Sequence, residues 1–475
     1  MPKEVTDIRQ MRVERVRRLL KYPNARVRAL LSVLHPTEIA LLLEDSPPEL
    51  QMRIVSSLST QVLSEAISEM DFDSHPSRIL TLLHPQVASK LIEELPWDDA
   101  ADLLAELTEE QKDKILNFVS QDEVPVLNRL MNYEEDSAGG LMNPDVVVVR
   151  ESMTKLEALR EVVKQSQDME EFYTIYVVDD DERLTGYLTF RSLFLAKNTE
   201  LVRQVMGRDI VSVSVNMDQE AVAKVVQQYN FPTLPVVDSD GRLLGRITFD
   251  DVMDVIEEET TEDILNFAGV SEAENLRGGW ANAVRSRMPW LLVNLITASV
   301  SAFTVSRFGA TIERIVILTS LMPVIAGVAG NGATQALAVT IRRISTTGIP
   351  ARKALRVILK ELQVGAINGL MLGAIVSIVV ALLNPFSSAQ LVAMMGVVVF
   401  MAMLGNLMLA GLAGSFIPIF LERLGVDPAI ASSILITAFT DAIGFLLLLG
   451  LATRILLPLV STLGEIGTHL INPLL

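Results

Sequence analysis

The 475-residue sequence predicts a multidomain chain. We expect an all-α superhelical N-terminal domain, an α/β domain of two repeated copies, a connecting helix and an α-helical membrane domain with five transmembrane helices. The two parts of the chain differ in charge. Ten Lys or Arg and six Asp or Glu lie from Pro289 onward, whereas thirty Lys or Arg and fifty-two Asp or Glu lie before it. Five long apolar segments follow that division, and a repeat with an offset of fifty-nine residues precedes it.

The N-terminal domain is predicted over residues 1–135. Apolar residues recur there at helical spacing, as in Leu103, Leu104 and Leu107, and prolines interrupt the pattern at short intervals. Short helices broken by proline predict a superhelical stack. His35 and His84 each precede a proline at an expected helix start, so they are interpreted as turn residues rather than metal ligands.

The α/β domain is predicted as two copies, 136–200 and 201–255. The segments that begin at Tyr176 and Leu184 align with those that begin at Pro235 and Leu243. Each copy predicts the order strand, helix, strand, turn, strand, helix, because short β-branched runs flank Asp-rich turns.

The connecting helix is predicted over 256–284. Asp251, Asp254, Glu258 and Glu262 recur every three or four residues and so share one helix face. Like charges at this spacing destabilise a helix by a few tenths of a kcal/mol per pair. Two hypotheses explain the face: a solvated acidic surface, or a switch whose carboxylates repel one another until divalent cations bridge them.

The membrane domain is predicted over 285–475, with spans near 290–306, 315–340, 358–383, 391–421 and 430–457. Each is long enough to cross a bilayer, which takes roughly 20 residues. Basic residues collect in the links on one side, above all in positions 342–360, and such links usually face the cytosol. This predicts a cell (inner) membrane protein with a cytoplasmic N-terminus and an external C-terminus, and the basic link is interpreted as a topology signal only.

The composition excludes several function classes. The acidic first half lacks the basic surface that nucleic-acid binding needs, and the absence of cysteine excludes disulfides and thiolate metal sites. The charged neighbourhood of Met1 has no signal-peptide core. We find no nucleophile and base constellation, phosphate loop or zinc motif, so an enzyme is not expected.

Asp441 stands alone in the middle of the fifth span. Burying a carboxylate at the centre of a membrane helix costs roughly 2.5–3.5 kcal/mol, so such a group normally faces a partner or a water-filled path. No Lys or Arg lies at that depth, which favours a cation over a purely structural hydrogen bond. In the second span, Gly330 and Asn331 belong to a run of small and amide residues that predicts close helix packing, and both are also candidates to line a pore.

Carboxylate and amide oxygens without nearby histidine or cysteine suit a hard ion such as Mg²⁺. One Asp per chain is too few for a dehydrated six-oxygen cage. A symmetric dimer would bring two Asp441 side chains to one axis, where they could hold a largely hydrated dication.

The stretch Pro-x-x-x-Gly-x-x-Gly-Asn-Gly-x-x-Gln at 323–335, with Asp441 and Gly444 in the last of five spans, resembles the MgtE family. The resemblance implies a homodimeric Mg²⁺ channel with its pore between the subunits. Asp441 would be the selectivity carboxylate, and Thr437 would supply a main-chain oxygen one turn earlier. At Ser433, a further pore-lining candidate, the sequence departs from relatives, which often have an Asn or Ser followed by Pro.

The repeat resembles a tandem CBS pair, a regulatory module that often holds adenine nucleotides. This implies ATP binding near Arg191 and Phe231. The cytosolic magnesium ligands of the MgtE family correspond to residues of the second copy and of the connecting, or plug, helix: Asp218, Glu220, Asp251, Asp254, Glu259, Glu262 and Asp263. Acids of the N-terminal domain would face them: Asp98, Asp99 and Asp102. Asn230 stands where relatives can carry Asp, which would weaken one such site.

The sequence therefore predicts a Mg²⁺-selective channel that closes when cytosolic Mg²⁺ binds between its acidic surfaces. One alternative is a transporter that prefers Co²⁺, Mn²⁺ or Ca²⁺. The other is a membrane-anchored nucleotide sensor that conducts nothing and leaves Asp441 without a purpose.

Overall fold

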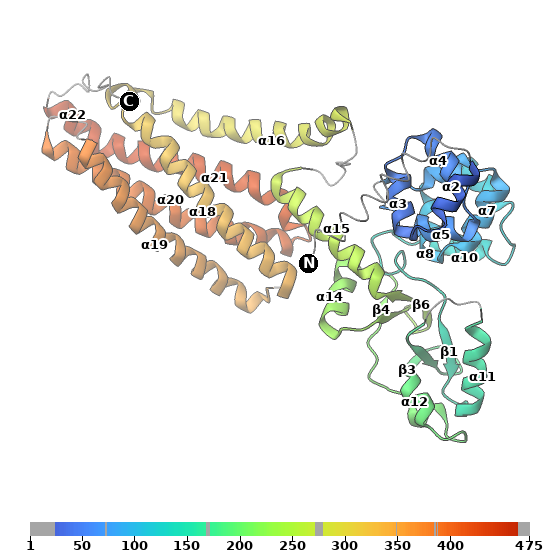
Figure 1. The fold of residues 1–475 in the computed structure, drawn as a ribbon. Coiled ribbons are helices and arrows are strands. Elements are labelled where there is room, and N and C mark those ends of the chain that lie inside the picture. The colour runs from blue at the N-terminus through green and yellow to red at the C-terminus, as the bar shows by residue number, and fades with distance from the viewer. Residues whose placement is uncertain are drawn as a thin grey trace. The chain divides into compact units, whose positions relative to one another are not determined.

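The computed structural model describes residues 24–71, 74–167, 172–270, 279–347, 349–383, 386 and 388–463, without the side chains of 24–26, 347, 351 and 429–433. The chain divides into two compact units, Met1–Glu259 and Thr260–Leu475. Figure 1 shows the first in blue to green and the second in green to red.

The first unit begins with a stack of short helices around a leucine-rich core. Prolines open several of them at the first turn, where a missing N–H costs nothing. His35 and His84 are N-caps, as the turn interpretation predicts. The helices are α2 (Asn24–Leu31), α3 (Pro36–Glu44), α4 (Pro48–Val55), α5 (Thr60–Ser68), α6 (Ser77–Leu82), α7 (Pro85–Glu94), α8 (Trp97–Ala105), α9 (Glu109–Leu116) and α10 (Val124–Leu130).

Two copies of the predicted α/β pattern follow, which confirms this part of the fold. The first copy holds β1 (Val147–Arg150), α11 (Lys155–Gln165), β2 (Ile175–Val178), β3 (Leu184–Leu188) and α12 (Phe190–Leu195). The second holds α13 (Val202–Val205), β4 (Val213–Ser214), α14 (Gln219–Tyr229), β5 (Thr233–Val237), β6 (Leu243–Thr248) and α15 (Phe249–Ala268). In both sheets the middle strand pairs parallel with the first strand and antiparallel with the third.

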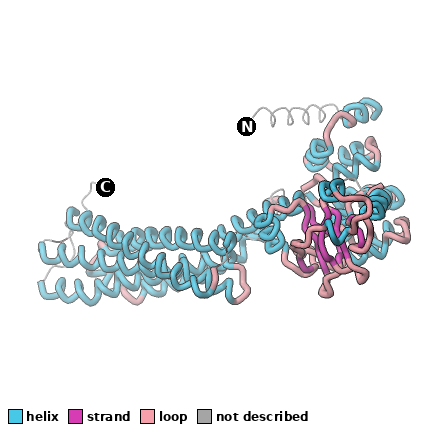
Figure 2. The backbone as a smooth tube through the Cα atoms, turned by 90° about the horizontal axis from the view of Figure 1, so that it is seen from below, coloured by secondary structure: helices cyan, strands magenta, loops and turns pink. Residues whose placement is uncertain are grey.

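The two copies meet at equivalent positions. The hydroxyl of Thr233 donates to that of Thr174, its counterpart fifty-nine residues earlier, over 3.1 Å. The buried Tyr176 hydroxyl donates to Thr233 over 3.0 Å, and burial raises the pKa of Tyr176 to about 12. Figure 2 shows the strands of both copies, in magenta, within the first unit. The repeat is therefore a folded pair and not two separate modules.

Helix α15 continues from the second copy across the division between the units. It ends at Ala268, where Gly269 has a φ of +72°, a left-handed conformation that glycine adopts without steric cost. The next helix begins at Trp280. The predicted connecting segment, 256–284, thus contains the end of α15 and the start of the first long apolar helix, while 271–278 lie outside the described residues.

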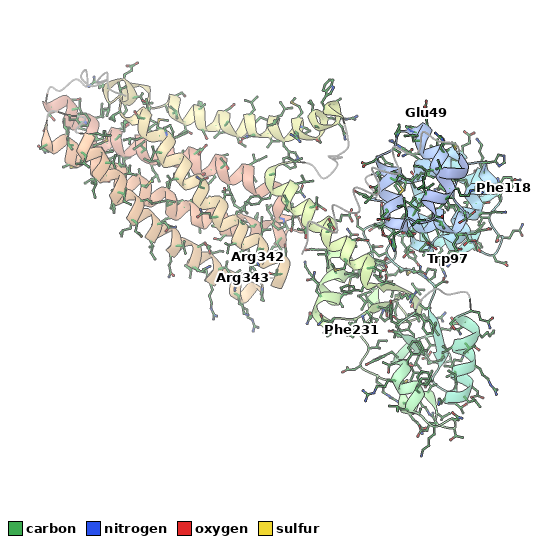
Figure 3. The ribbon with its side chains drawn as sticks, viewed as in Figure 1. Glu49, Trp97, Phe118, Phe231, Arg342 and Arg343 are labelled. Carbon is green, nitrogen blue, oxygen red and sulfur yellow. The ribbon has the colours of Figure 1, made fainter. Side chains whose placement is uncertain are left out.

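Five helices of the described chain are long and apolar enough to cross a membrane, which confirms the predicted spans. They are α16 (Trp280–Ser306), α18 (Leu318–Thr347), α19 (Ala351–Leu383), α20 (Ala389–Arg423) and α21 (Pro428–Leu451). The short α17 (Gly309–Arg314) joins the first two, and α21 continues through a π-helical turn (Ala452–Leu456) into α22 (Leu457–Leu463). Arg342 and Arg343 extend from the end of α18 (Figure 3), beyond the apolar part of that helix.

Helix α20 lies at the centre of the second unit and packs against α18, α19 and α21. Glycines allow the closest approaches. A Cβ added at Gly365 would lie 2.3 Å from the Leu407 carbonyl oxygen, and one at Gly411 would lie 2.4 Å from that of Glu361. Small residues therefore bring α19 and α20 together, as is common between membrane helices.

Candidate ion pathway and cation-binding carboxylates

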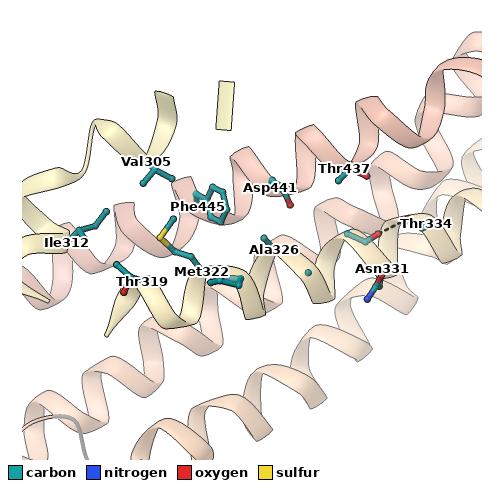
Figure 4. A pocket seen from close by; sticks show the side chains of 13 residues that line it. Val305, Ile312, Thr319, Met322, Ala326, Asn331, Thr334, Thr437, Asp441 and Phe445 are labelled. Carbon is teal, nitrogen blue, oxygen red and sulfur yellow. Dashed lines mark hydrogen bonds between the residues drawn. The ribbon is translucent and has the colours of Figure 1, made fainter. Parts of the chain in front are cut away.

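A cleft of about 790 Å³ lies in the second unit, mainly between α18 and α21. Figure 4 shows Asp441 and Thr437 on α21, with Ala326 and Asn331 on α18. The lining residues are Val305, Ile312, Thr319, Met322, Pro323, Ala326, Gly327, Gly330, Asn331, Thr334, Thr437, Asp441 and Phe445. The structure thus brings together Asp441, Thr437, Asn331 and Gly330, four of the five residues predicted to line a pore.

Helical spacing explains why these residues share the cleft. Thr437, Asp441 and Phe445 are four residues apart and so lie on one face of α21. On α18 the same periodicity places Gly327, Gly330 and Thr334 on the cleft side. The fifth predicted residue, Ser433, lies near the start of α21, but its side chain is outside the described part of the chain.

The glycines of α18 that line the cleft are not needed for helix packing. A Cβ added at Gly327 would have no neighbour within 4 Å, and one at Gly330 would reach only the Thr440 hydroxyl at 3.9 Å. Gly414 on α20 differs, because its Cβ would lie 2.5 Å from the Ala333 carbonyl oxygen. The close helix packing predicted for this glycine-rich stretch is therefore wrong for Gly327 and Gly330, which line the cleft instead.

Among the described residues that line the cleft, Asp441 is the only charged one. The other polar side chains there are the hydroxyls of three threonines and the amide of Asn331. Since these lining residues include no Lys or Arg, a bound cation is the fitting positive partner for the Asp441 carboxylate. The main-chain oxygen of Thr437 accepts a hydrogen bond from the Thr440 hydroxyl over 3.0 Å, within the same turn as Asp441.

In the first unit, two acids of α8 lie close to the acidic start of α15. Asp98 accepts a hydrogen bond from the Asn143 amide over 3.2 Å. Burial raises the pKa of Asp98 well above its ordinary value, and the charges of Asp99 and Asp251 raise it further. Burial also raises the pKa of Asp99 to about 6, and Asp251 and Asp254 add to this shift. The structure therefore pairs Asp98 and Asp99 with Asp251 and Asp254.

Asp102, one turn further along α8, has other neighbours. Burial raises its pKa to about 7, with contributions from Glu135, Asp99 and Glu106. The largest contribution from a charge comes from Glu135, not from α15. The structure thus separates Asp102 from the pair at the α8 and α15 contact.

A second group of acidic residues lies where α14 and α15 meet. Burial raises the pKa of Glu259, and the charges of Glu220 and Asp218 raise it further. The Gln219 amide donates to Glu259 over 2.8 Å. Asp218 is also the N-cap of α14, where it accepts from the main-chain N–H groups of Glu220 (3.0 Å) and Ala221 (3.4 Å). Asp218 therefore has a structural role whether or not it binds a cation.

Glu262 and Asp263 belong to the part of α15 in the second unit. The buried Asn266 amide donates to Glu262 over 3.1 Å and to Asp427 over 3.5 Å. Asp427 lies just before α21, the helix that carries Asp441. This amide therefore links the end of α15 to the membrane helices.

Carboxylates in pairs fit a magnesium ion that keeps part of its water shell, because Mg²⁺ is usually bound through one or two carboxylates and several waters. Within the described ranges, no group of three or more His, Cys, Asp or Glu is arranged to hold a metal directly. Asp98 and Asp99 lie close to Asp251 and Asp254, and burial and mutual repulsion raise the pKa of Asp98 and Asp99. A bound cation would neutralise the negative charge of such a pair. The residues present thus fit a hydrated dication better than a fully protein-coordinated one.

The residues proposed for nucleotide binding come from different copies. Arg191 is exposed on α12 of the first copy. Phe231 packs against the core of the second copy, and its ring stacks on that of Tyr229 with centroids 5.5 Å apart. Asn230, between them, ends α14 with a φ of +54°, so it serves as a helix cap.

Sequence reasoning missed the neutral side chains that hold the acids. Asn143, Gln219 and Asn266 each donate an amide hydrogen to a predicted ligand. It also missed Asn406, a fully buried amide on α20. The signal for Asn406 was available, since an amide in the middle of the apolar stretch 391–421 is unusual.

Comparisons with known proteins match the N-terminal helices, the two α/β copies and the membrane helices as separate domains. Residues 322–451 match the MgtE family of divalent cation transporters, 34–136 match the MgtE intracellular N domain, and 138–198 and 202–258 match CBS domains. The magnesium transporter MgtE of Thermus thermophilus is 34% identical over 444 residues, which cover 90% of this chain and 95% of that protein. The one of Bacillus subtilis is 30% identical over 426 residues, with 90% and 93% covered.

A crystal structure of the cytosolic domain of the Mg²⁺ channel MgtE in complex with ATP is also similar. It is 34% identical, covers 50% of this chain and 97% of that one, and superposes with a TM-score of 0.47.

Proposed function

The chain belongs to the MgtE family of divalent cation transporters, and from this premise we propose that it is a homodimeric, Mg²⁺-selective channel closed by cytosolic Mg²⁺. It is a multi-pass membrane protein, with five long apolar helices in the part of the chain that the structure describes. The observation that carries the proposal is one cleft that contains Asp441, Thr437 and Asn331 and has no basic residue among the described residues that line it.

Asp441 would attract the transported ion by its charge, which acts strongly where little water screens it. Mg²⁺ releases its water reluctantly, so oxygens of the protein would hydrogen-bond to the water shell. Asn331 and Thr437 line the same cleft, so we expect the Asn331 amide and the main-chain oxygen of Thr437 to do this. A second copy of the chain would add a second Asp441 and complete the site on the dimer axis.

The carboxylates of the first unit would sense Mg²⁺ on the cytosolic side. Asp98 and Asp99 oppose Asp251 and Asp254, and Asp218 and Glu220 oppose Glu259. The raised pKa values of Asp98, Asp99 and Glu259 support the view that this close arrangement is costly while these groups are charged. Binding of Mg²⁺ between them would neutralise the charge and stabilise the close arrangement, because a ligand shifts the population toward the state that binds it better. Glu262 and Asp263 would extend the response toward the membrane helices.

Support for the orientation comes from the basic positions 342–360 between α18 and α19, which favour a cytosolic location for that link. ATP binding near Arg191 and Phe231 stays a prediction that a nucleotide titration can test. A preference for Co²⁺, Mn²⁺ or Ca²⁺ is an outcome of the flux measurement below.

The test is uptake of Mg²⁺ into liposomes that contain wild-type protein or the Asp441→Asn variant. Asn keeps the size of the side chain but removes the charge, so we expect uptake to fall at least tenfold. The variant should fold as a dimer and be at least as stable, since a costly buried charge has gone. Asp441→Glu keeps the charge but moves it by one methylene, so it should retain partial uptake with an altered ion preference.

Glu313→Gln is the matched control, because Glu313 is an exposed acid on α17 that does not line the cleft. Its uptake should equal that of wild type. Wild-type uptake by a folded Asp441→Asn dimer would place the selectivity site elsewhere.

A further inference from the structure

Asn406 is a fully buried amide in the middle of α20, the central helix of the second unit. Its neighbours along the helix are glycine and apolar residues. It does not line the cleft, and neither the motif at 323–335 nor the role of Asp441 accounts for it.

The Asn406 amide contacts both helices that form the cleft. Its Nδ2 donates to the main-chain oxygen of Ile325 on α18 over 3.4 Å. The same nitrogen lies against Gly444 on α21, where an added Cβ would be only 2.4 Å away. Gly444 is thus required in this arrangement, because any side chain there would displace the amide.

Both contacts lie next to residues that line the cleft. Ile325 precedes Ala326 on α18, and Gly444 precedes Phe445 and follows Asp441 by three residues on α21. A shift of either helix against Asn406 would therefore change the distance between the Asp441 carboxylate and the opposite wall. One side chain behind the cleft connects to both walls.

Stability alone does not explain this amide. Within the described chain, its Oδ1 is buried without a hydrogen-bond partner, and an unsatisfied buried acceptor destabilises a protein. An apolar residue of similar volume would avoid this cost. The Nδ2 contact is long for a hydrogen bond, so it offsets little of the loss.

We propose that Asn406 is a positioning residue that fixes the spacing of α18 and α21 and thereby sets discrimination between Mg²⁺ and larger dications. This rests on the proposed channel function. A pathway that fits hydrated Mg²⁺ depends on a defined width, and Ca²⁺ differs from Mg²⁺ mainly by its longer ligand distances and more flexible coordination.

The experiment compares Mg²⁺ and Ca²⁺ uptake into liposomes by wild type and Asn406→Leu. We expect the Leu variant to fold with an unchanged or higher melting temperature, while its ratio of Mg²⁺ to Ca²⁺ uptake falls at least threefold. Asn368→Leu is the matched control, because Asn368 is an exposed amide on α19, and its ratio should stay at the wild-type value. A folded Asn406→Leu dimer with the wild-type ratio would overturn the proposal.

A second pair of variants keeps the test decisive if the Leu variant does not fold. Gly444→Ala should lower the ratio, since its Cβ takes the place of the amide, and Asn406→Ala added to it should relieve this clash without restoring discrimination. A double variant with the wild-type ratio would overturn the proposal. If wild type carries no Mg²⁺, the channel function fails, whereas an unchanged ratio in folded variants overturns only the role of Asn406.

Discussion

At the scale of single residues, burial makes the charged form of the carboxylates between α8 and α15 less favourable. Burial raises the pKa of Asp99 to about 6 and that of Asp102 to about 7. Burial also raises the pKa of Asp251, and the charge of Arg246 opposes part of this shift. The close arrangement of the two helices therefore depends on what neutralises the remaining charge, whether protons or a metal ion.

This gives a prediction for pH. A carboxyl group with a raised pKa binds a proton more tightly in the close arrangement, so that arrangement gains stability as pH falls from about 7 toward the ordinary value near 4. Without Mg²⁺, the first unit of the full-length protein should resist proteolysis better at pH 6 than at pH 8. Adding Mg²⁺ at pH 8 should protect the first unit against proteolysis about as well as lowering the pH to 6 does.

Limited proteolysis checks this, with rates corrected at each pH against an unfolded substrate. Asp99→Asn should reduce the difference between pH 6 and pH 8, because it removes one titrating group. Faster cleavage at pH 6, or equal cleavage with chelator and with Mg²⁺ at pH 8, would contradict the sensor.

Asp441 and Asn331 could be predicted as candidate pore residues because such polar groups are rare in membrane helices and therefore stand out. The contacts of Asn143 and Asn406 could not be predicted, because each of these amides donates to a group far away in the sequence. Asn143 and Asp98 are forty-five residues apart, and Asn406 and Ile325 are eighty-one apart. Such pairs depend on how helices pack, which local periodicity does not report.

At the scale of elements, α15 carries the acids that we propose couple Mg²⁺ sensing to the membrane helices. Replacing Asp251, Asp254, Glu259 and Glu262 by Asn or Gln relieves like-charge repulsion, so the helix should persist. The bridging ligands are lost, however, and channel closure should no longer depend on cytosolic Mg²⁺. Flux at low and high cytosolic Mg²⁺ measures this.

The control removes the same number and kind of charges from exposed sites: Glu109, Glu110, Asp180 and Asp240. This control variant should close at the same Mg²⁺ concentration as wild type. If the quadruple variant of α15 also closes at that concentration, its four acids are not the sensor.

The glycines of the membrane helices give a second prediction at this scale. Gly365→Ala places a Cβ against the Leu407 carbonyl, so we expect a loss of about 1–3 kcal/mol in stability. Gly327→Ala meets no atom within 4 Å and improves helix propensity, so stability should hold or rise while flux falls, because the methyl group enters the cleft. Thermal unfolding and uptake of both variants check this contrast, and equal stability of the two would contradict the assigned packing.

The sequence predicted the types of the helices and strands more accurately than the residues at which they begin and end. The repeat and the five spans were readable because strand and membrane-helix patterns are regular. Helix α16 begins at Trp280, ten residues before the predicted span at 290, and α19 begins at Ala351, seven before 358. Both helices continue into polar sequence because backbone hydrogen bonding does not stop where the apolar segment does.

At the scale of the whole molecule, the chain combines an acidic unit that fits Mg²⁺ sensing with a membrane unit that fits Mg²⁺ conduction. The fold class could be predicted because the two halves differ so strongly in charge and hydropathy. The cleft and the carboxylate pairs needed the structure, since each brings together helices that are distant in the sequence. Feedback closure is the central claim, because it explains why both units occur in one chain.

The most direct test is Mg²⁺ flux through wild-type protein in liposomes while Mg²⁺ is varied on the side that carries the acidic unit. We predict high flux when Mg²⁺ there is kept low by chelator and a steep fall as it rises into the millimolar range, with Asp441→Asn near background throughout. Flux that does not change with Mg²⁺ on that side would contradict gating by the acidic unit, and absence of flux at every concentration would contradict conduction itself.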